Sequence, residues 1–526
     1  MTLTRRFRGL MLLVPVVVVL LGTLPWNGNP MPIRASELRV LMCARNMADG
    51  GSWLVPVYDR EVRVNKPPLM YWVVASVFRV AGGSDSLAVA RGVNAALGVF
   101  LVLAVYGCGR YWVGRRRAWV SALTVATSYL FLRFARVCET DIALTLFTLL
   151  ACFSLWRAGI SRSGWRWWVL AGVFAGIGFM FKGPAALVLP VAALATAYVT
   201  GAAHSWKRSG AGLLLLMVPF LVIVLPWYLK LMLGQINGAA QQDIGYEVAA
   251  LMKESPHKRA IIYYLYVLPI AMMPWGLFLP AAMVQAWRRR GRPGVRFLMG
   301  WLVSAVVLMS LLKSKQLHYA MLLMPPAALL TGGYLCEAAR NPLRFKGVGS
   351  FLHGISWLMV VAGGGVVLLP WFVEGVSCRV GFWWGLPVIL TGVVAALVKR
   401  GNPVSRGMIA LMVMSVWTAA GFSAVFHELR EPAAIYRECA AEVRNRAGVA
   451  TQVFITGRRV IPMEYYVHKP LQESDDFAQA WDSALPGDLV IVSVNSKHRH
   501  VLTMAPPCPP VFERRQGDVE LKIYVR

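Results

Sequence analysis

The sequence predicts an all-α polytopic membrane protein with a small extracytoplasmic α/β domain at its C-terminal end. Three observations lead to this prediction. Hydrophobic residues make up 57% of the 526 residues, whereas soluble domains contain roughly 45–50%. They fall into repeated apolar runs of about 18–25 residues, the length that crosses a bilayer core. Short loops between the runs carry most of the Lys and Arg, as is typical of cytoplasmic loops.

The charge and the cysteines argue against other classes of protein. The net charge of +29 is spread over many short loops, whereas a nucleic-acid-binding domain gathers its basic residues on one face. The eight Cys form no CxxC pair, so the spacing of a zinc knuckle is absent. Several of them lie inside apolar runs, where Cys behaves as a small hydrophobic residue. The pattern does not indicate a disulfide framework.

The apolar runs predict about thirteen transmembrane helices. The first follows a basic N-terminus and precedes no small-residue cleavage site, so we interpret it as an uncleaved span rather than a signal peptide. A shorter apolar segment, 67–82, is expected to form a helix at the membrane interface. The predicted spans are 9–26, 87–109, 118–134, 140–157, 167–182, 184–201, 210–231, 263–287, 296–312, 319–337, 351–371, 382–398 and 407–425.

The distribution of Lys and Arg gives these spans a direction. Basic loops alternate strictly with loops that contain few cations, which places the N-terminus in the cytoplasm of a cytoplasmic (inner) membrane protein. The opposite, extracytoplasmic side then holds two long loops, 27–86 and 232–262, and the tail. The basic loops contain Arg5, Arg6, Arg8, Arg110, Arg115–Arg117, Arg157, Arg162, Arg166, Lys207, Arg208, Arg288–Arg290, Arg292, Arg340, Arg344, Lys346, Lys399, Arg400 and Arg406.

The composition changes near residue 426, so we predict a transmembrane domain over 1–426 and a separate domain over 427–526. In the second domain, a helical pattern over about 432–446 precedes four β-like runs, TQVFITG, MEYYVHK, DLVIVSV and VELKIYV. Alternating or β-branched runs bounded by Gly, Asp and Pro are typical of strands. No Gly-rich nucleotide-binding loop is present in the chain.

The first outer loop holds a carboxylate and a cation near the membrane surface. Glu37 begins a helical stretch about ten residues after the first span, and Lys66 directly precedes Pro67 and Pro68, which restrict its backbone. A solvated loop with surface charges is the simpler interpretation. A held carboxylate and cation would, however, suit a substrate that combines a nucleophile with a phosphate.

Two further carboxylates, Glu139 and Asp141, lie where the fourth span begins. Charged groups at such a boundary are costly and often functional, although an Asp at a helix start is also a common capping residue. We expect Arg133 or Arg136 to pair with Asp141.

Cations also occur on the outer side, where the charge rule predicts few. Lys182 ends the fifth span, and Lys313, Lys315, His318 and Tyr319 lie between the ninth and tenth spans. Cations kept there suggest an anion such as a phosphate between them. The loop 232–262 ends in a basic and aromatic stretch that fits either an interfacial belt or a binding edge for a polyanionic lipid head. That stretch contains Lys253, His257, Lys258, Arg259, Tyr263 and Tyr264.

These segments resemble, in order, the motifs of the PMT/ArnT-like glycosyltransferases, a GT-C family. GSWLVPVYDREVRVNKPPLMYW resembles the family's GDW-x-x-P…KPPL-x-YW segment, and SELRVLMCARNM resembles its first-loop acidic motif. ARVCETDIALTLF, GIGFMFKGPAALVLP, PHKRAIIYY and KSKQLHYAMLLMPPAALLTG follow where expected. The resemblance covers residues 10–340 well and the remainder only by layout. It implies a GT-C fold and transfer of a sugar, with inversion, from a polyprenyl-phosphate donor.

The resemblance also implies roles for individual residues. Glu37 matches the glutamate of the first-loop motif and is the predicted catalytic base. The aminoarabinose transferases of the family carry an Asp just before that glutamate, whereas this chain has Ser36. Asp141 matches the second acidic position and is expected to orient the acceptor or to share the role of base.

The donor phosphate is expected to lie on basic residues of the outer face, with Lys66 as its principal ligand. Family members often have a Glu before this lysine that is linked to a metal site. Here that residue is Asn65, a poor zinc ligand, so a divalent metal is left in doubt although His257 matches the loop histidine. The other residues that match the donor site by position are Arg39, His257, Lys315 and Tyr319.

We therefore predict a membrane glycosyltransferase whose partners are a polyprenyl-phosphate-linked sugar and a lipid, protein or glycan acceptor of the cell envelope, lipid A included. No cofactor is certain. One alternative is a transporter or flippase of lipid-linked sugars, which would be expected to show internal repeats and charges at mid-membrane. Another is a non-enzymatic sensor or assembly protein. The sequence shows no clear repeat, and its candidate polar residues lie at the outer boundary.

Overall fold

The computed structural model describes seventeen stretches of the chain, and all structural statements below refer to them. They are residues 13–24, 35–58, 61–83, 86–161, 164–202, 209–233, 259–372, 378–398, 401–429, 432–448, 450–457, 463, 466–467, 471–474, 476–494, 507–516 and 519–526.

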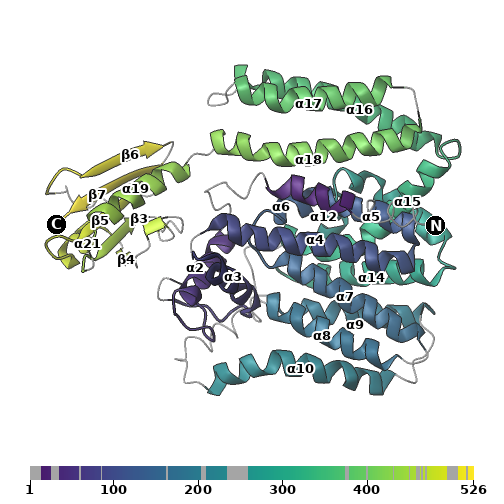
Figure 1. The fold of residues 1–526 in the computed structure, drawn as a ribbon, viewed down its shortest axis with the longest axis horizontal. Coiled ribbons are helices and arrows are strands. Elements are labelled where there is room, and N and C mark those ends of the chain that lie inside the picture. Colours follow the sequence, from purple (N-terminus) through teal and green to yellow (C-terminus); the bar gives the residue numbers. More distant parts are fainter. Residues whose placement is uncertain are drawn as a thin grey trace.

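The chain is a multi-pass helical membrane protein (Figure 1). Every predicted span contains helix. Among the described residues, seven helices are long and apolar enough to cross a membrane, and four apolar helices are shorter, so the count of thirteen stays a prediction. The helices are Leu13–Leu24, α4 (Leu87–Trp112), α5 (Arg115–Ala126), α6 (Tyr129–Phe134), α7 (Asp141–Ile160), α8 (Trp165–Lys182), α9 (Ala185–Val199), α10 (Ser209–Leu233), α12 (Tyr263–Ala271), α13 (Leu279–Arg288), α14 (Pro293–Leu311), α15 (Met324–Arg340), α16 (Lys346–Leu368), α17 (Cys378–Leu397) and α18 (Pro403–Leu429).

Two of the predicted spans are interrupted, and the interruptions contact each other. The span 118–134 is divided into α5 and α6 around Thr127, and the span 263–287 into α12, the 3-10 turn η2 (Trp275–Phe278) and α13. The indole Nε1 of Trp275 donates to Thr127 Oγ1 at 2.8 Å, and the Tyr129 N–H donates to the Met273 carbonyl at 2.9 Å. Backbone that leaves a helix within a membrane must be satisfied by neighbouring protein, and here each break helps to satisfy the other.

Close packing joins the helices into one core. Trp112 of α4 stacks on Phe297 of α14 with ring centroids 5.6 Å apart, and its ring meets Trp156 of α7 edge-on at 5.7 Å. On α15, a Cβ added to Gly332 would lie 2.6 Å from the Cα of Ser121 on α5. Only glycine permits that approach, which brings the two helix backbones together.

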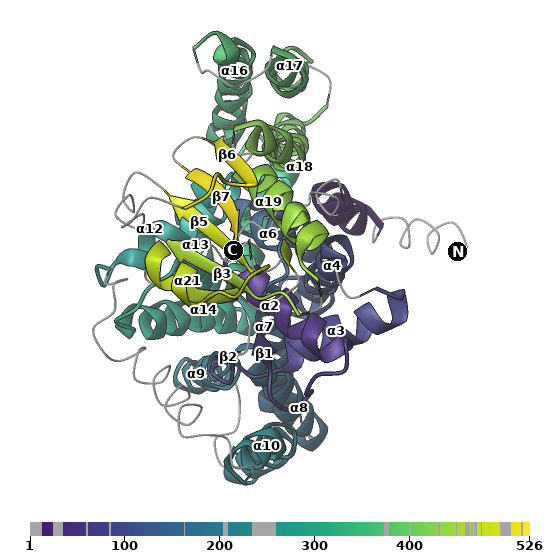
Figure 2. The ribbon, with the colours of Figure 1, turned by 90° about the vertical axis from the view of Figure 1, so that its left-hand side faces the viewer.

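The first outer loop folds into a compact cap at one end of the bundle. It contains α2 (Ala35–Ala48), a hairpin of β1 (Val57–Tyr58) and β2 (Glu61–Val62), and α3 (Leu69–Ala81). The helix predicted over 67–82 is thus present as α3, and it buries a face that includes Tyr71 and Phe78 against α2. The same end of the bundle carries the C-terminal sheet. Figure 2 views this end and shows the sheet in front of the helices, with α2 and α3 beside it.

The C-terminal part is a mixed five-stranded sheet with a helix on each face. Strand order is β4-β3-β5-β7-β6; β3 pairs in parallel with β4 and β5, and β7 pairs antiparallel with β5 and β6. Alternate residues of the central strands face α19 and α21, which produces two apolar layers. The elements are α19 (Pro432–Arg446), β3 (Val453–Gly457), β4 (Leu471–Ser474), α21 (Phe477–Ser483), β5 (Leu489–Val494), β6 (Phe512–Gln516) and β7 (Val519–Val525).

The predicted helix over 432–446 and three of the four predicted strands are confirmed as α19, β3, β5 and β7. The strand predicted at MEYYVHK is wrong, because the described residues there, Met463, Tyr466 and Val467, are helical. All three are buried, and Met463 and Val467 are four residues apart. That spacing forms one face of a helix, so the apolar residues of this segment follow a helical period.

Candidate active site

An ion pair joins the ends of two neighbouring helices. Asp141 is the first residue of α7 and Lys182 the last residue of α8, and Lys182 Nζ donates to Asp141 Oδ1 at 2.7 Å. The side chain of Asp141 is 5% exposed and that of Lys182 is 15% exposed. The sequence predicted Arg133 or Arg136 as the partner of Asp141, and the structure corrects this to Lys182. Arg133 instead donates to the Tyr129 hydroxyl.

Further cations face this pair. His318 and Lys66 lie within electrostatic range of Asp141, together with Lys182. The structure thus brings together Lys66 from the first loop, Asp141 and Lys182 from the membrane helices, and His318 from the segment before α15. In the described structure the second carboxylate oxygen, Asp141 Oδ2, is buried and accepts no hydrogen bond. A buried oxygen in that state lacks the partner that such groups normally have, and a ligand's hydroxyl group would supply one.

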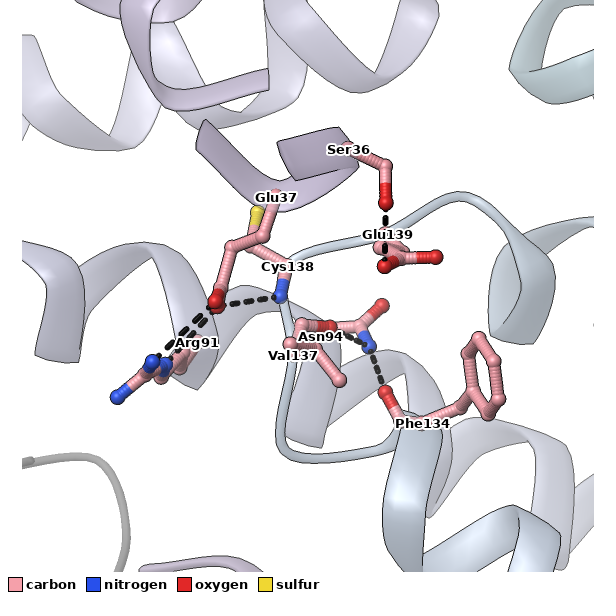
Figure 3. A network of polar contacts seen from close by, with 8 residues as sticks. All are labelled: Ser36, Glu37, Arg91, Asn94, Phe134, Val137, Cys138 and Glu139. Carbon is pink, nitrogen blue, oxygen red and sulfur yellow. Dashed lines mark hydrogen bonds and ion pairs between the residues drawn. The ribbon is translucent and has the colours of Figure 1, made fainter. Parts of the chain in front are cut away.

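A second, fully buried ion pair lies beneath α2. Arg91 of α4 donates to both oxygens of Glu37, at 2.9 and 3.2 Å, and both side chains are 0% exposed. The backbone N–H of Cys138 also donates to Glu37 Oε1, at 3.1 Å. Glu37 therefore links α2 to α4 and to the turn before α7 (Figure 3).

This geometry does not fit the prediction that Glu37 is the catalytic base. A base needs an oxygen within hydrogen-bond reach of its substrate. The carboxylate of Glu37 is enclosed by protein and bound by a buried guanidinium and a backbone N–H. We therefore propose that Glu37 positions the turn rather than accepting a proton.

The turn itself presents Glu139. The amide of Asn94 on α4 donates to the carbonyls of Phe134 and Val137, at 2.7 and 2.6 Å. With the turn held in this way, the Ser36 hydroxyl donates to Glu139 Oε1 at 2.7 Å (Figure 3). Two adjacent residues of α2 thus fix the turn. The Glu37 carboxylate accepts from the main-chain N–H of Cys138, and the Ser36 hydroxyl donates to the side chain of Glu139.

A basic and apolar cavity opens beside the segment that precedes α15. It has a volume of about 520 Å³, and Arg259, Lys313 and Lys315 are among the residues that line it. The buried Lys315 ammonium donates to the Leu312 carbonyl at 2.6 Å. Apolar side chains complete the lining, namely those of Ala260, Ile261, Leu311 and Leu312. Cations beside an apolar wall match the chemistry of a lipid phosphate.

Tyr319 lies beside Lys182 of the ion pair. Its ring lies 5.8 Å from the Lys182 ammonium, within the range of a cation–π contact, and it meets the His318 ring edge-on at 4.6 Å. Two of the predicted donor-site residues, Lys315 and Tyr319, thus lie in one segment between the cavity and the ion pair.

The remaining predicted ligands are placed differently. Arg39 lies on α2, where its charge acts on the Cys43 thiol, so its contact with the donor stays a prediction. His257 lies outside the described residues. Within those residues, no three His, Cys, Asp or Glu side chains gather as a metal site would require, and Asn65 occupies the position of the family's Glu. The described residues therefore do not fit a metal ion at this place.

The sequence analysis did not single out Arg91 and Asn94. Both are 0% exposed and lie three residues apart on α4, within an apolar run. A charged and an amide side chain on one face of a membrane helix are a signal of a buried polar network. That rule, applied to the second span, would have found them.

Known protein families and structures agree with this architecture. Residues 65–229 match the family described as dolichyl-phosphate-mannose-protein mannosyltransferase. The undecaprenyl phosphate-alpha-4-amino-4-deoxy-L-arabinose arabinosyl transferase of Edwardsiella ictaluri is 29% identical over 375 residues. That alignment covers 68% of this chain and 64% of the relative, so the chain matches less than two thirds of the relative's length.

Two solved structures share the fold. ArnT from Cupriavidus metallidurans, bound to undecaprenyl phosphate, superposes with a TM-score of 0.75 at 17% identity and covers 98% of each chain. The oligosaccharyltransferase AglB from Archaeoglobus fulgidus superposes with a TM-score of 0.55 at 11% identity, over 93% of this chain and 70% of its own. The fold and the charged cluster define a multi-pass membrane protein of the GT-C class.

The sequence matches point to one family within that class. The chain is similar to members of the PMT/ArnT-like family of GT-C proteins, and the resemblance inferred from its motifs is confirmed.

Proposed function

We propose that this protein is an inverting membrane glycosyltransferase that moves a sugar from a polyprenyl-phosphate donor to an acceptor of the cell envelope. One observation carries the proposal. A buried carboxylate, Asp141, is paired with Lys182 at the end of two membrane helices, and the segment that brings Tyr319 to Lys182 also supplies Lys313 and Lys315 to a cavity with basic and apolar walls. A lipid-linked sugar phosphate requires that combination of groups.

The donor would lie with its lipid chain along the apolar wall of the cavity and its phosphate among the cations. Lys315, Lys313 and Arg259 line the cavity, and Lys66 and Lys182 lie on the side of Asp141. Negative charge builds on the phosphate oxygens as the sugar leaves. Cations already in place stabilise that charge without reorganisation, and electrostatic stabilisation of this kind commonly supplies most of an enzyme's rate enhancement.

The reaction would be a single displacement. The oxygen of an acceptor hydroxyl attacks the anomeric carbon, the bond between that carbon and the phosphate oxygen breaks, and the electron pair leaves with the polyprenyl phosphate. One displacement inverts the anomeric configuration. The hydroxyl proton passes to a carboxylate of the segment 139–141, and Asp141 Oδ2 is positioned to accept a hydrogen bond from the acceptor.

The location of the reaction follows from the charge pattern. The basic loops favour a cytoplasmic N-terminus, which puts α2, α3, the ion pair and the C-terminal sheet on the extracytoplasmic face of the cytoplasmic membrane. The relatives are sugar transferases that use a lipid phosphate, according to their names. This favours a transferase over a transporter, which needs its charged groups near the middle of the membrane.

Mass spectrometry of envelope lipids, glycans and glycoproteins, with and without the gene, tests the proposal. We expect one fraction to lose a mass increment equal to a single sugar and to regain it when the gene is restored. The affected fraction identifies the acceptor class, lipid A among them, and the increment identifies the sugar. Unchanged fractions throughout would contradict the proposal.

A further inference from the structure

Three carboxylates meet around one turn, and each is held by a different kind of group. Arg91 binds both oxygens of Glu37, and Lys182 binds Oδ1 of Asp141. The hydroxyl of Ser36 binds Oε1 of Glu139. These partners give the three carboxylates different roles.

The position of Glu139 is strongly determined by its surroundings. Its own N–H donates to the Val137 carbonyl at 2.8 Å, within a tight turn. Asn94 holds two carbonyls of that turn, and Glu37 holds the N–H of the preceding residue, Cys138. A side chain on a backbone fixed in this way is preorganised, which a catalytic group requires to within a fraction of an ångström.

We propose that Glu139, oriented by Ser36, is the carboxylate that accepts the proton of the acceptor hydroxyl. The inference rests on the proposed glycosyl transfer. Glu139 is 6% exposed, whereas Glu37 is 0% exposed, and Glu139 lies two residues before Asp141. The two carboxylates thus lie at the same end of α7. Glu139 is bound to α2 through the Ser36 hydroxyl, and Asp141 is bound to α8 through the Lys182 ammonium.

Asp141 and Glu139 therefore have different roles in the proposed reaction. Lys182 forms an ion pair with Asp141, and Lys66 and His318 lie within electrostatic range of it, so Asp141 holds the cations of the donor side and orients the acceptor through Oδ2. Glu139 takes the proton as the acceptor oxygen bonds to the sugar. No additional reactant is required, because the departing phosphate carries the electron pair away.

The short distance between Ser36 and Glu139 provides a decisive variant. Ser36 Oγ and Glu139 Oε1 are 2.7 Å apart, so exchanging the two functional groups keeps a carboxylate and a hydroxyl in contact. The double variant Ser36→Asp/Glu139→Ser places the carboxylate on α2 and the hydroxyl on the turn. A requirement for a carboxylate at this point predicts recovery. Because the exchange also keeps the hydrogen bond, Ser36→Ala, which breaks the bond and keeps the carboxylate, separates this requirement from a purely structural role of the contact.

The assay uses full-length protein in membranes from cells that lack the chromosomal gene. The rate is the appearance of the envelope species whose sugar increment depends on the wild-type gene, measured at matched protein levels. Binding of undecaprenyl phosphate to the purified variants is measured separately. We expect Glu139→Gln to lower the rate about 100-fold or more, the usual contribution of a general base, and to leave undecaprenyl phosphate binding within twofold. The exchanged variant should recover at least tenfold over Glu139→Gln.

Ser36→Ala should lower the rate by less than tenfold and shift its pH profile, since the carboxylate remains but loses a hydrogen-bond donor. A Glu139→Gln variant that keeps more than half of the wild-type rate would overturn the assignment. So would an exchanged variant that binds undecaprenyl phosphate normally but is no faster than Glu139→Gln. If wild-type membranes form no sugar-modified species, the proposed function fails as well, which separates the two outcomes.

Discussion

Lys182 Nζ lies 2.7 Å from Asp141 Oδ1, and the two residues are the last of one membrane helix and the first of another. The pair therefore depends on how α7 packs against α8. Under the proposed function, structure and catalysis would be linked at this point, because the same contact stabilises the helix ends and holds the charge of Asp141.

Replacement of Lys182 by Met should both destabilise the protein and abolish transfer. Removing one partner of a buried ion pair leaves an uncompensated charge, which costs on the order of 3 kcal/mol. We expect a lower Tm in detergent and a rate reduced at least 100-fold. The matched control is Asp141→Asn/Lys182→Met, which removes both charges and should regain most of the Tm but none of the rate. Recovery of the rate in that double variant would show that the pair is only structural.

For the pair formed by Glu37 and Arg91, removing both charges should restore activity as well as stability. Glu37→Gln leaves a buried guanidinium without its carboxylate, so the protein should lose stability and, with it, activity. Glu37→Gln/Arg91→Met removes both charges, and the Gln carbonyl can still accept the Cys138 N–H. This double variant should recover both Tm and at least a tenth of the wild-type transfer rate. A folded double variant with a rate more than 100-fold below wild type would restore Glu37 as a base candidate.

Charge in the donor cavity should govern donor affinity. Lys313 is exposed and lines the cavity with Lys315 and Arg259. A hydrogen bond to a charged group contributes roughly 1.5–3 kcal/mol, so Lys313→Gln should weaken undecaprenyl phosphate binding about tenfold. Lys346→Gln is the matched control, because this exposed lysine begins α16 away from the cavity. Equal affinity in the two variants would place the phosphate elsewhere.

Cysteine labelling should report the sidedness of the membrane helices. Cys378 at the start of α17 is exposed and Cys508 is partly exposed, whereas the other six cysteines are buried. In a Cys508→Ser background, a membrane-impermeant maleimide added to spheroplasts should label Cys378, and Cys378→Ser should remove the signal. Labelling only after the membrane is opened would reverse the predicted orientation.

The thiols of Cys43 and Cys439 should remain unlabelled in that experiment, although the predicted orientation puts both on the outer face. Burial raises the pKa of each thiol to about 12. For Cys43 the burial outweighs the charges of Arg63 and Arg39, which act in the opposite direction. Only the thiolate reacts, so both groups should stay protonated and inert at pH 8. Mass spectrometry of the labelled protein checks this, and modification of either residue under native conditions would contradict the packing of α2 or α19.

The sequence was informative wherever one local rule dominates. The apolar runs predicted helices at every span, and the acidic residues at 139 and 141 were recognised because charges at a membrane boundary are costly. The ion-pair partner of Asp141 could also have been predicted from the sequence. The fourth predicted span begins and the fifth ends on the outer face, so antiparallel packing brings Lys182 to Asp141, whereas the choice of Arg133 or Arg136 relied on proximity along the chain.

Other features depend on contacts that no local pattern specifies. The break between α5 and α6 is satisfied by Trp275, which lies 148 residues away along the chain, so a hydropathy average continues through it. Glu37 resembled a surface base because its loop is polar, yet Arg91, 54 residues away, encloses it. In both cases burial and a distant partner decide the role of the residue.

The central claim is that the charged end of this helical bundle transfers a sugar from a lipid phosphate. The most direct measurement compares the envelope fractions of cells that express wild-type protein or Asp141→Asn at equal membrane levels, by mass spectrometry. We predict that the sugar-modified species seen with the wild type falls at least 100-fold with Asp141→Asn, while the purified variant keeps a defined Tm. Equal amounts of that species in the two strains would contradict the claim.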